Sequence, residues 1–244
     1  MRFKYLLIPV LFFTLTIFVT GCSTLDVLNI SDVKALLMND RELEKEVAGV
    51  NLEILNKEYN LKSPRKNSQY VKALHKLETK NPTSLDYKIH ISNSKAVNAL
   101  YIGNGNIVLF KGLLQKLNRE DQVAAVIAHE MGHGINKHIV KNIRSNIGSK
   151  VVKEALHEAG VGVNIRNFGM YFLKNGFSRG QEEEADIESL KLLKKANYNP
   201  GAAIQVMEKL DKMNASDLKL LEIFQTHPLP KTRINYMSKY LRKH

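Results

Sequence analysis

The chain has 244 residues and a net charge of +12, with 36 lysines and arginines against 24 aspartates and glutamates. This length suffices for one domain with a sizeable core, and a single cysteine excludes an internal disulfide. The basic residues are spread along the chain and no aromatic-basic surface stands out, so nucleic acid is not an expected partner.

The first segment has the pattern of a secretory signal peptide. Arg2 and Lys4 precede an apolar stretch, residues 5–19, which is short for a membrane span and contains Pro9. We therefore expect a cleaved signal peptide over residues 1–21. A single uncleaved anchor helix is the alternative.

Residues 19–22, Val-Thr-Gly-Cys, are similar to a bacterial lipobox, whose cysteine carries diacylglycerol after cleavage. Cys22 would then anchor the chain to a membrane through its lipid. Ser23 replaces the aspartate associated with inner-membrane retention, so the similarity implies an outer-membrane lipoprotein that faces the periplasm. We expect a lipidated N-terminus and linker over residues 22–30 and a single domain over residues 31–244.

Helical patterns dominate this domain. Residues 32–59 and 67–79 predict two helices, separated by a polar breaker at residues 62–64 (Lys-Ser-Pro). Another helix is predicted to begin after Asn118, which is a candidate N-cap with Asp121 three positions on.

Two strand candidates, residues 87–92 and 107–110, lie between these helices. The glycines and asparagines of residues 98–105 suit a hairpin turn with positive φ. The sequence therefore predicts an α+β domain that is mostly helical and contains a small β-sheet.

The helix after Asn118 carries the sequence His-Glu-Met-Gly-His at residues 129–133. His129 and His133 are four residues apart, so their imidazoles face the same way and could share one zinc ion. Glu130 lies about 100° round the helix, where it could serve as a base rather than a ligand. Gly132 weakens the helix, which makes sense where another segment approaches closely. Two core histidines with ordinary hydrogen-bond partners are the alternative.

A second helix, with acidic residues in its first turns, is predicted to begin near Ser178. Ser178 and Gln181 form a capping box, and the helical pattern continues to Leu193. Glu182 and Asp186 share a face, as expected of a metal ligand and of a carboxylate that orients a ligand imidazole. A solvated face stabilised by the helix dipole is the alternative.

The two segments that flank this helix are less informative. Residues 141–175 are apolar and glycine-bearing, and could form helices beside a cleft. Pro200 suits the first turn of a helix that extends to about Met213, and a terminal helix is predicted from about Lys231.

The two motifs together resemble those of the zinc peptidases related to CAAX prenyl proteases and HtpX, whose second motif reads Ser-Arg-x-x-Glu-x-x-Ala-Asp. The resemblance implies a zincin-like metallopeptidase domain with its small sheet beside the active-site helix. It implies one Zn²⁺ per chain, and it leaves Glu183 and Glu184 outside the metal site. It also implies these roles: His129, His133 and Glu182 as ligands, Glu130 as catalytic base, and Asp186 as support for a ligand.

A third segment, Thr226 to Arg233, is similar to the His-Pro segment of the periplasmic BepA and LoiP-type members of that family. There the histidine can occupy the open position of the zinc, so the resemblance makes His227 a candidate regulatory fourth ligand. From the residues alone, His227 precedes a proline and lies on a loop, where an ordinary solvated histidine is the alternative.

The chain departs from the family at one place. Members often read Asn-Ala-Phe-x-x-Pro-Gly-Gly before the zinc helix, whereas here Asn98 and Ala99 are followed by Leu-Tyr-Ile-Gly-Asn-Gly. If the family arrangement holds, Asn98 and Ala99 mark a sheet edge along which an extended peptide substrate could add as a strand. A purely structural hairpin is the alternative.

The expected function is zinc-dependent hydrolysis of peptide bonds by a bacterial metalloendopeptidase without a covalent intermediate. The expected substrates are misfolded or misassembled envelope proteins, such as unfolded or stalled outer-membrane proteins. One alternative is a zinc-binding lipoprotein that acts mainly as a chaperone or assembly factor for outer-membrane proteins. Another is an exported helical lipoprotein without metal. The residue that stabilises the oxyanion stays open among five candidates: Tyr171, Tyr198, Arg233, Tyr236 and His227.

Overall fold

The computed structural model describes residues 37–146, 169, 173–213, 227 and 230–244. In chain order their helices and strands are α2 (Asp40–Tyr59), α3 (Gln69–Lys80), β1 (Lys88–Ser92), β2 (Ala99–Gly103), β3 (Asn106–Phe110), α4 (Lys111–Leu114), α5 (Glu120–Ile135), α8 (Arg179–Lys195), α9 (Gly201–Asp211) and α12 (Pro230–Lys243). Residues 138–146 are also helical.

Several predicted features lie outside the described residues. They are the signal peptide over residues 1–21, the lipidation site Cys22, the linker to residue 30 and most of residues 141–175. No helix within the described ranges combines the length and the apolar character that a membrane crossing requires.

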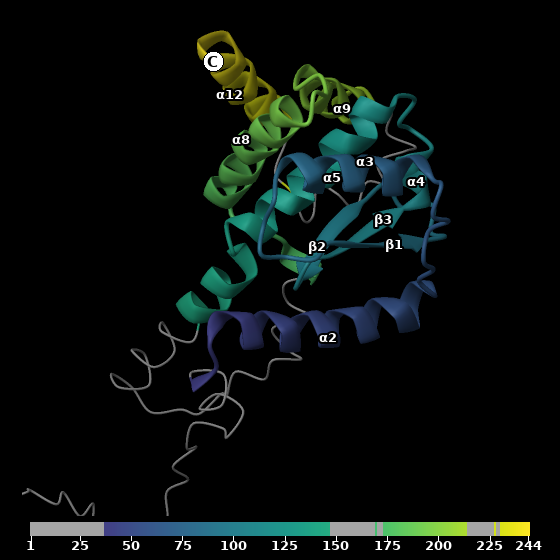
Figure 1. Ribbon diagram of the computed structural model, residues 1–244, viewed down its shortest axis with the longest axis vertical. Helices are drawn as coiled ribbons and strands as arrows, with labels where there is room; N and C mark the ends of the chain where they lie inside the picture. Colours follow the sequence, from purple (N-terminus) through teal and green to yellow (C-terminus); the bar gives the residue numbers. More distant parts are fainter. Residues whose placement is uncertain (1–36, 147–168, 170–172, 214–226, 228–229) are drawn as a thin grey trace, which may run out of the picture.

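The sheet has three strands in the order β1-β3-β2 (Figure 1). β1 runs parallel to β3 with Lys88 opposite Asn106, and β2 runs antiparallel to β3 with Ala99 opposite Leu109. β2 is therefore an edge strand, although it lies between its two sheet partners in sequence.

The sequence predicted a hairpin turn over residues 98–105, but the turn in the structure is shorter. Positive φ is confirmed at Gly103, Asn104 and Gly105, with values of 102°, 47° and 78°. The prediction was wrong for Ala99–Gly103, which form β2. All five residues of β2 are buried, so the strand lacks the polar alternation by which a strand is recognised in sequence.

Helices cover both faces of the sheet. α2 lies along one face, while α3 and α5 lie on the other (Figure 1). Leu100 and Ile102 of β2 pack with Leu55 of α2, whereas Ala99 and Tyr101 pack into the larger cluster that contains the apolar residues of α3 and α5. The period of two along β2 thus places α5 directly behind the edge strand.

α5 begins one residue later than predicted. Arg119 occupies the N-cap without a side-chain cap, and the backbone N–H of Asn118 instead donates to the side chain of Gln122. The predicted cap at Asn118 was therefore wrong. The capping box between Ser178 and Gln181 at the start of α8 is confirmed.

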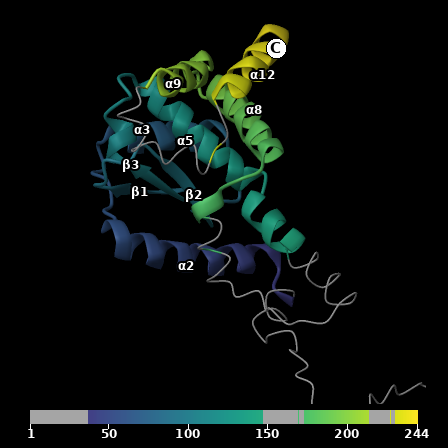
Figure 2. The ribbon, with the colours of Figure 1, turned by 180° about the vertical axis from the view of Figure 1, so that it is seen from behind.

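Close packing of α5 against α8 depends on Gly132. A Cβ atom built at Gly132 would lie 2.8 Å from the backbone oxygen of Ala185, a distance that Cβ atoms essentially never show. The predicted close approach at this glycine is thus confirmed. Seen from behind in Figure 2, α8, α9 and α12 gather along α5, away from α2.

Candidate metal centre

The helix α5 carries both histidines of the first motif on one buried face. The side chains of His129 and His133 are separated by one turn, and their Nε2 atoms lie 3.1 Å apart. The residues are 8% and 0% exposed, which is unusual for two neighbouring imidazoles unless they share a partner.

The helix α8 brings Glu182 to these two nitrogens. One carboxylate oxygen lies 3.4 Å from Nε2 of His129, and the other lies 3.5 Å from Nε2 of His133. A tetrahedral zinc ion with ligand distances of about 2.0–2.2 Å holds its donors about 3.3–3.6 Å apart. The two distances to Glu182 fall within this range and the 3.1 Å between the Nε2 atoms lies slightly below it, so a small shift of the two imidazoles would admit such an ion.

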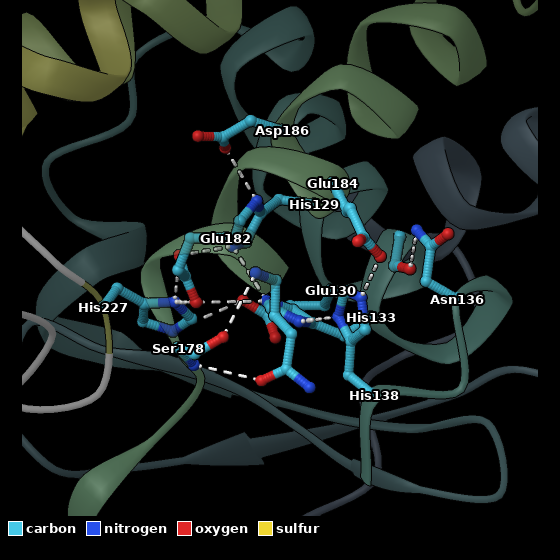
Figure 3. A network of polar contacts seen from close by, with 12 residues as sticks. His129, Glu130, His133, Asn136, His138, Ser178, Glu182, Glu184, Asp186 and His227 are labelled. Carbon is cyan, nitrogen blue, oxygen red and sulfur yellow. Dashed lines mark hydrogen bonds and ion pairs between the residues drawn. The ribbon is translucent and has the colours of Figure 1, made fainter. Parts of the chain in front are cut away.

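His227 completes the group from a segment 45 residues further along the chain. Its Nδ1 lies 2.8 and 2.9 Å from the two carboxylate oxygens of Glu182. His129, His133, Glu182 and His227 are all buried, and each offers one ligand atom within 4.8 Å of the others. Figure 3 shows these side chains turned toward a common centre.

Glu130 lies beside this group on α5 and is 2% exposed. Its Oε1 is 4.0 Å from Nε2 of His227, and its Oε2 has no hydrogen-bond partner among the described residues. Burial raises the pKa of Glu130, although His227 and His129 act in the opposite direction. An unpaired buried carboxylate oxygen is costly unless a ligand or a water approaches it.

Asp186, one turn after Glu182, contacts the outer nitrogen of His129. Its Oδ1 lies 2.9 Å from His129 Nδ1, and Arg233 of α12 holds the same carboxylate through Nε and an Nη atom at 2.8 and 2.7 Å. Tyr236 also donates to it. Burial would raise the pKa of Asp186, but Arg233 and His129 hold it well below its usual range.

The site buries more carboxyl groups than permanent cations. Glu130, Glu182 and Asp186 are buried, and among the described residues the buried guanidinium of Arg233 contacts two of them, Glu182 and Asp186. Burial and Arg233 lower the pKa of His129, yet the neighbouring carboxylates raise it to about 9. A divalent cation would offset the same negative charge, so both the charge and the donor set fit a metal.

The candidates for oxyanion stabilisation separate in space. Tyr198 donates to Glu120 at the start of α5, and Tyr171 lies outside the described residues. Arg233 and Tyr236 lie at the site, but both are engaged with carboxylates. Arg233, Tyr236 and His227 therefore remain candidates for oxyanion stabilisation. Tyr198 is excluded because it lies at Glu120, away from the site.

His138 and Phe177, which the sequence did not single out, contact His133. Its Nδ1 lies 2.9 Å from Nδ1 of His138, whose Nε2 lies 3.1 Å from Glu184. Phe177 stacks on the His133 ring, with centroids 3.6 Å apart. Burial lowers the pKa of His138, whereas the hydrogen bond from His138 lowers that of Glu184. Glu184 is not one of the four metal-donor residues, and it connects to their group through His138.

A small cavity opens beside the centre. Ala99 of the edge strand lines it together with His129 and Glu130. Asn98 does not line it: its side-chain oxygen accepts from the backbone N–H of Ala99, and its carbonyl accepts from Phe110. Of the two residues proposed from sequence for the substrate strand, only Ala99 borders the site.

Comparison with known proteins gives a consistent assignment. Residues 61–241 match the profile of peptidase family M48. The chain is 32% identical over 181 residues to the mitochondrial metalloendopeptidase OMA1 of Arabidopsis thaliana, a match that covers 74% of this chain and 36% of that protein. It is 30% identical over 182 residues to the metalloprotease LoiP of Escherichia coli, with 70% of each chain covered.

A more distant relative and one solved structure are also similar to this chain. The β-barrel assembly-enhancing protease of Escherichia coli is 26% identical, over 68% of this chain and 37% of that protein. This chain thus spans well under half the length of some of its relatives. The crystal structure of Ste24p from S. mikatae shares the fold, with a TM-score of 0.50 and 18% identity over 79% of this chain and 55% of that one.

Proposed function

Because the chain belongs to peptidase family M48, we propose that it is a zinc-dependent metalloendopeptidase of the bacterial cell envelope. The resemblance to the BepA and LoiP type that the sequence indicated is confirmed. One observation carries the proposal: the donor atoms of His129, His133 and Glu182 come from two separate helices and lie 3.1, 3.4 and 3.5 Å apart.

In this proposal, His129, His133 and Glu182 hold the metal. When bound there, zinc would supply Lewis acidity that polarises a peptide carbonyl and acidifies a water. Asp186 accepts a hydrogen bond from Nδ1 of His129 and so leaves Nε2 free to face the metal. Arg233 fixes Asp186 in turn, and also lies 3.2 Å from Glu182.

Glu130 is the proposed general base. It is the buried carboxylate with an unpaired oxygen beside the metal donors, so it can accept a proton from the attacking water and return it to the leaving amine. A substrate bound in extended form along the free edge of β2 at Ala99 would pass this carboxylate.

Replacing Glu130 by glutamine tests the proposal. We expect zinc to stay near one ion per chain, while cleavage of an unfolded outer-membrane protein falls by about 10²–10⁴-fold because proton transfer is lost. Glu183→Gln, an exposed neighbour of the ligand Glu182, is the matched control. If Glu130→Gln keeps both its zinc and its function in the cell, the chain acts mainly as an assembly factor, and the peptidase proposal fails.

The proposed substrates are misfolded or misassembled envelope proteins, including stalled outer-membrane proteins. The support is the name of one relative, a β-barrel assembly-enhancing protease, together with the export signal that the sequence predicts over residues 1–21. Purified wild type should degrade an unfolded outer-membrane protein and spare its folded form. Equal degradation of both forms would argue against this substrate class.

The proposed location is the periplasmic face of the outer membrane, with the lipid of Cys22 as anchor. The lipobox-like residues 19–22 and the absence of aspartate at position 23 support it. Labelled palmitate should be incorporated into the wild-type chain and not into Cys22→Ala. Labelling that persists in the variant would contradict the anchor.

A further inference from the structure

The outer side of His133 connects to the protein surface through two further side chains. Nδ1 of His133 faces Nδ1 of His138 at 2.9 Å, and Nε2 of His138 faces an oxygen of Glu184 at 3.1 Å. His133 and His138 are completely buried, whereas the side chain of Glu184 is 54% exposed. Figure 3 shows the three residues in a row that leads away from the metal donors.

The contacts along this row determine which ring nitrogen of each histidine carries the proton. Nε2 of His133 faces the other metal donors, so its ring proton resides on Nδ1 and must be donated to His138. Nδ1 of a neutral His138 must therefore accept, which leaves the proton of His138 on Nε2. That proton is donated to the carboxylate of Glu184. Glu184 thus selects the only tautomer of His138 that can accept from His133.

Packing against an aromatic ring also restrains the imidazole of His133. Phe177 stacks on His133 with an angle of 12° between the ring planes. The stacked ring limits tilting, but it provides no hydrogen-bond acceptor, so it cannot set which nitrogen of His133 carries the proton. Among the described residues, the hydrogen-bond partner of Nδ1 of His133 is His138.

We propose that His138 and Glu184 are positioning residues that hold His133 with Nε2 directed at the metal and thereby tighten metal binding. This inference rests on the proposed function, in which His133 is a zinc ligand. Loss of a hydrogen-bond partner behind a ligand histidine typically weakens metal affinity by 10–100-fold. Both residues act through His133 and do not touch substrate.

Zinc affinity of the purified protein, measured by competition with a chromophoric chelator, tests the proposal. We expect His138→Leu, which cannot accept a hydrogen bond, to raise the zinc dissociation constant by about 10–100-fold. His138→Asn places an amide oxygen near the position of Nδ1 and should recover most of the affinity. If His138→Asn binds zinc no more tightly than His138→Leu, the role of the hydrogen bond is overturned.

Surface variants test the outer end of the row without disturbing the core. Glu184→Leu should weaken zinc binding by up to about tenfold, because His138 is then free to adopt the other tautomer. Glu183→Leu, at the exposed position before it, is the matched control and should bind as wild type does. If Glu184→Leu and Glu183→Leu have the same affinity as wild type, the proposal is overturned.

A double variant and a spectrum separate positioning from a general loss of structure. Since Glu184 acts through His138, the variant His138→Leu/Glu184→Leu should bind zinc no more weakly than His138→Leu alone, and additive losses would overturn the proposal. Cobalt-loaded His138→Leu should show a shifted visible spectrum, and an unchanged spectrum would count against positioning. If wild type itself binds no zinc, the proposed function fails. The other negative outcomes contradict only the positioning role of His138 and Glu184.

Discussion

Glu182 is the residue on which the contacts of the site converge. His129, His133, His227 and Arg233 all approach its carboxylate, which is 1% exposed. Burial would raise the pKa of Glu182, but His227 and Arg233 hold it well below its usual range. The carboxylate therefore remains ionised in a buried place, as a metal ligand must.

The contact between His227 and Glu182 makes the predicted regulatory role of His227 testable. Replacing His227 by alanine removes a hydrogen bond to a charged group, which is worth about 1.5–3 kcal/mol. If His227 restrains the resting site, proteolysis by His227→Ala should rise about ten- to hundredfold while zinc is retained. The measurement is cleavage rate together with zinc content.

The variant His129→Ala is the control for this prediction, because it removes a proposed ligand and should lose zinc. Equal loss of zinc from His227→Ala and His129→Ala would refute the regulatory assignment. His227 would then be an ordinary structural ligand.

At the scale of elements, the separation of α5 and α8 sets the spacing of the metal donors. Gly132→Ala should destabilise the fold by about 1–3 kcal/mol, since the added methyl meets the backbone of Ala185 and this outweighs the gain in helix propensity. Zinc affinity should fall with it. Urea unfolding and chelator competition measure the two effects.

The matched control is Gly49→Ala in α2, where a Cβ atom meets nothing within 4 Å. This variant should be more stable by about 0.5–1 kcal/mol, because alanine favours the helix and restricts the unfolded chain. A similar gain in Gly132→Ala would show that α5 and α8 do not need their close approach.

The sequence predicted the two ligand helices because their signals are local. The spacing of His129 and His133 and the capping box at Ser178 each lie within one helix. β2 was missed because a strand buried along its whole length has no alternation. β1 pairs in parallel with β3 and not with β2, which follows it in sequence, and no local pattern encodes this order.

The relationships between distant segments were the least predictable part of the site. His138 precedes Glu184 by 46 residues, and nothing in the spacing indicates that the two meet. Arg233 was one of several oxyanion candidates, and only the docking of α12 shows that it pairs with Asp186 and Glu182. The shared helix face made Glu182 and Asp186 candidates, but only the resemblance favoured them over a solvated face and gave His227 a role, because it carries information about tertiary structure that the local sequence lacks.

At the scale of the whole molecule, the metal should stabilise the fold, because it offsets the negative charge that α5 and α8 bury together. At a free zinc concentration about 100 times the dissociation constant, the stabilisation is about 2.7 kcal/mol. A chelator should therefore lower the melting temperature by roughly 5–10 °C for a domain of this size. Differential scanning calorimetry of wild type with and without chelator measures the shift.

The variant His129→Ala separates this effect from chelation elsewhere on the chain. Without its first proposed ligand it should melt at the same temperature with and without chelator. A shift as large as that of wild type would mean that the stabilising ion binds at another place.

The bond from Arg233 to Asp186 has a consequence for biosynthesis. Arg233 lies 104 residues after His129, so a ribosome releases the zinc helix long before it releases the guanidinium that neutralises the centre. A nascent or incompletely folded copy therefore has the His-Glu-Met-Gly-His motif without a finished hydrolytic apparatus. The centre is therefore complete only after α12 docks and brings Arg233 to Asp186 and Glu182.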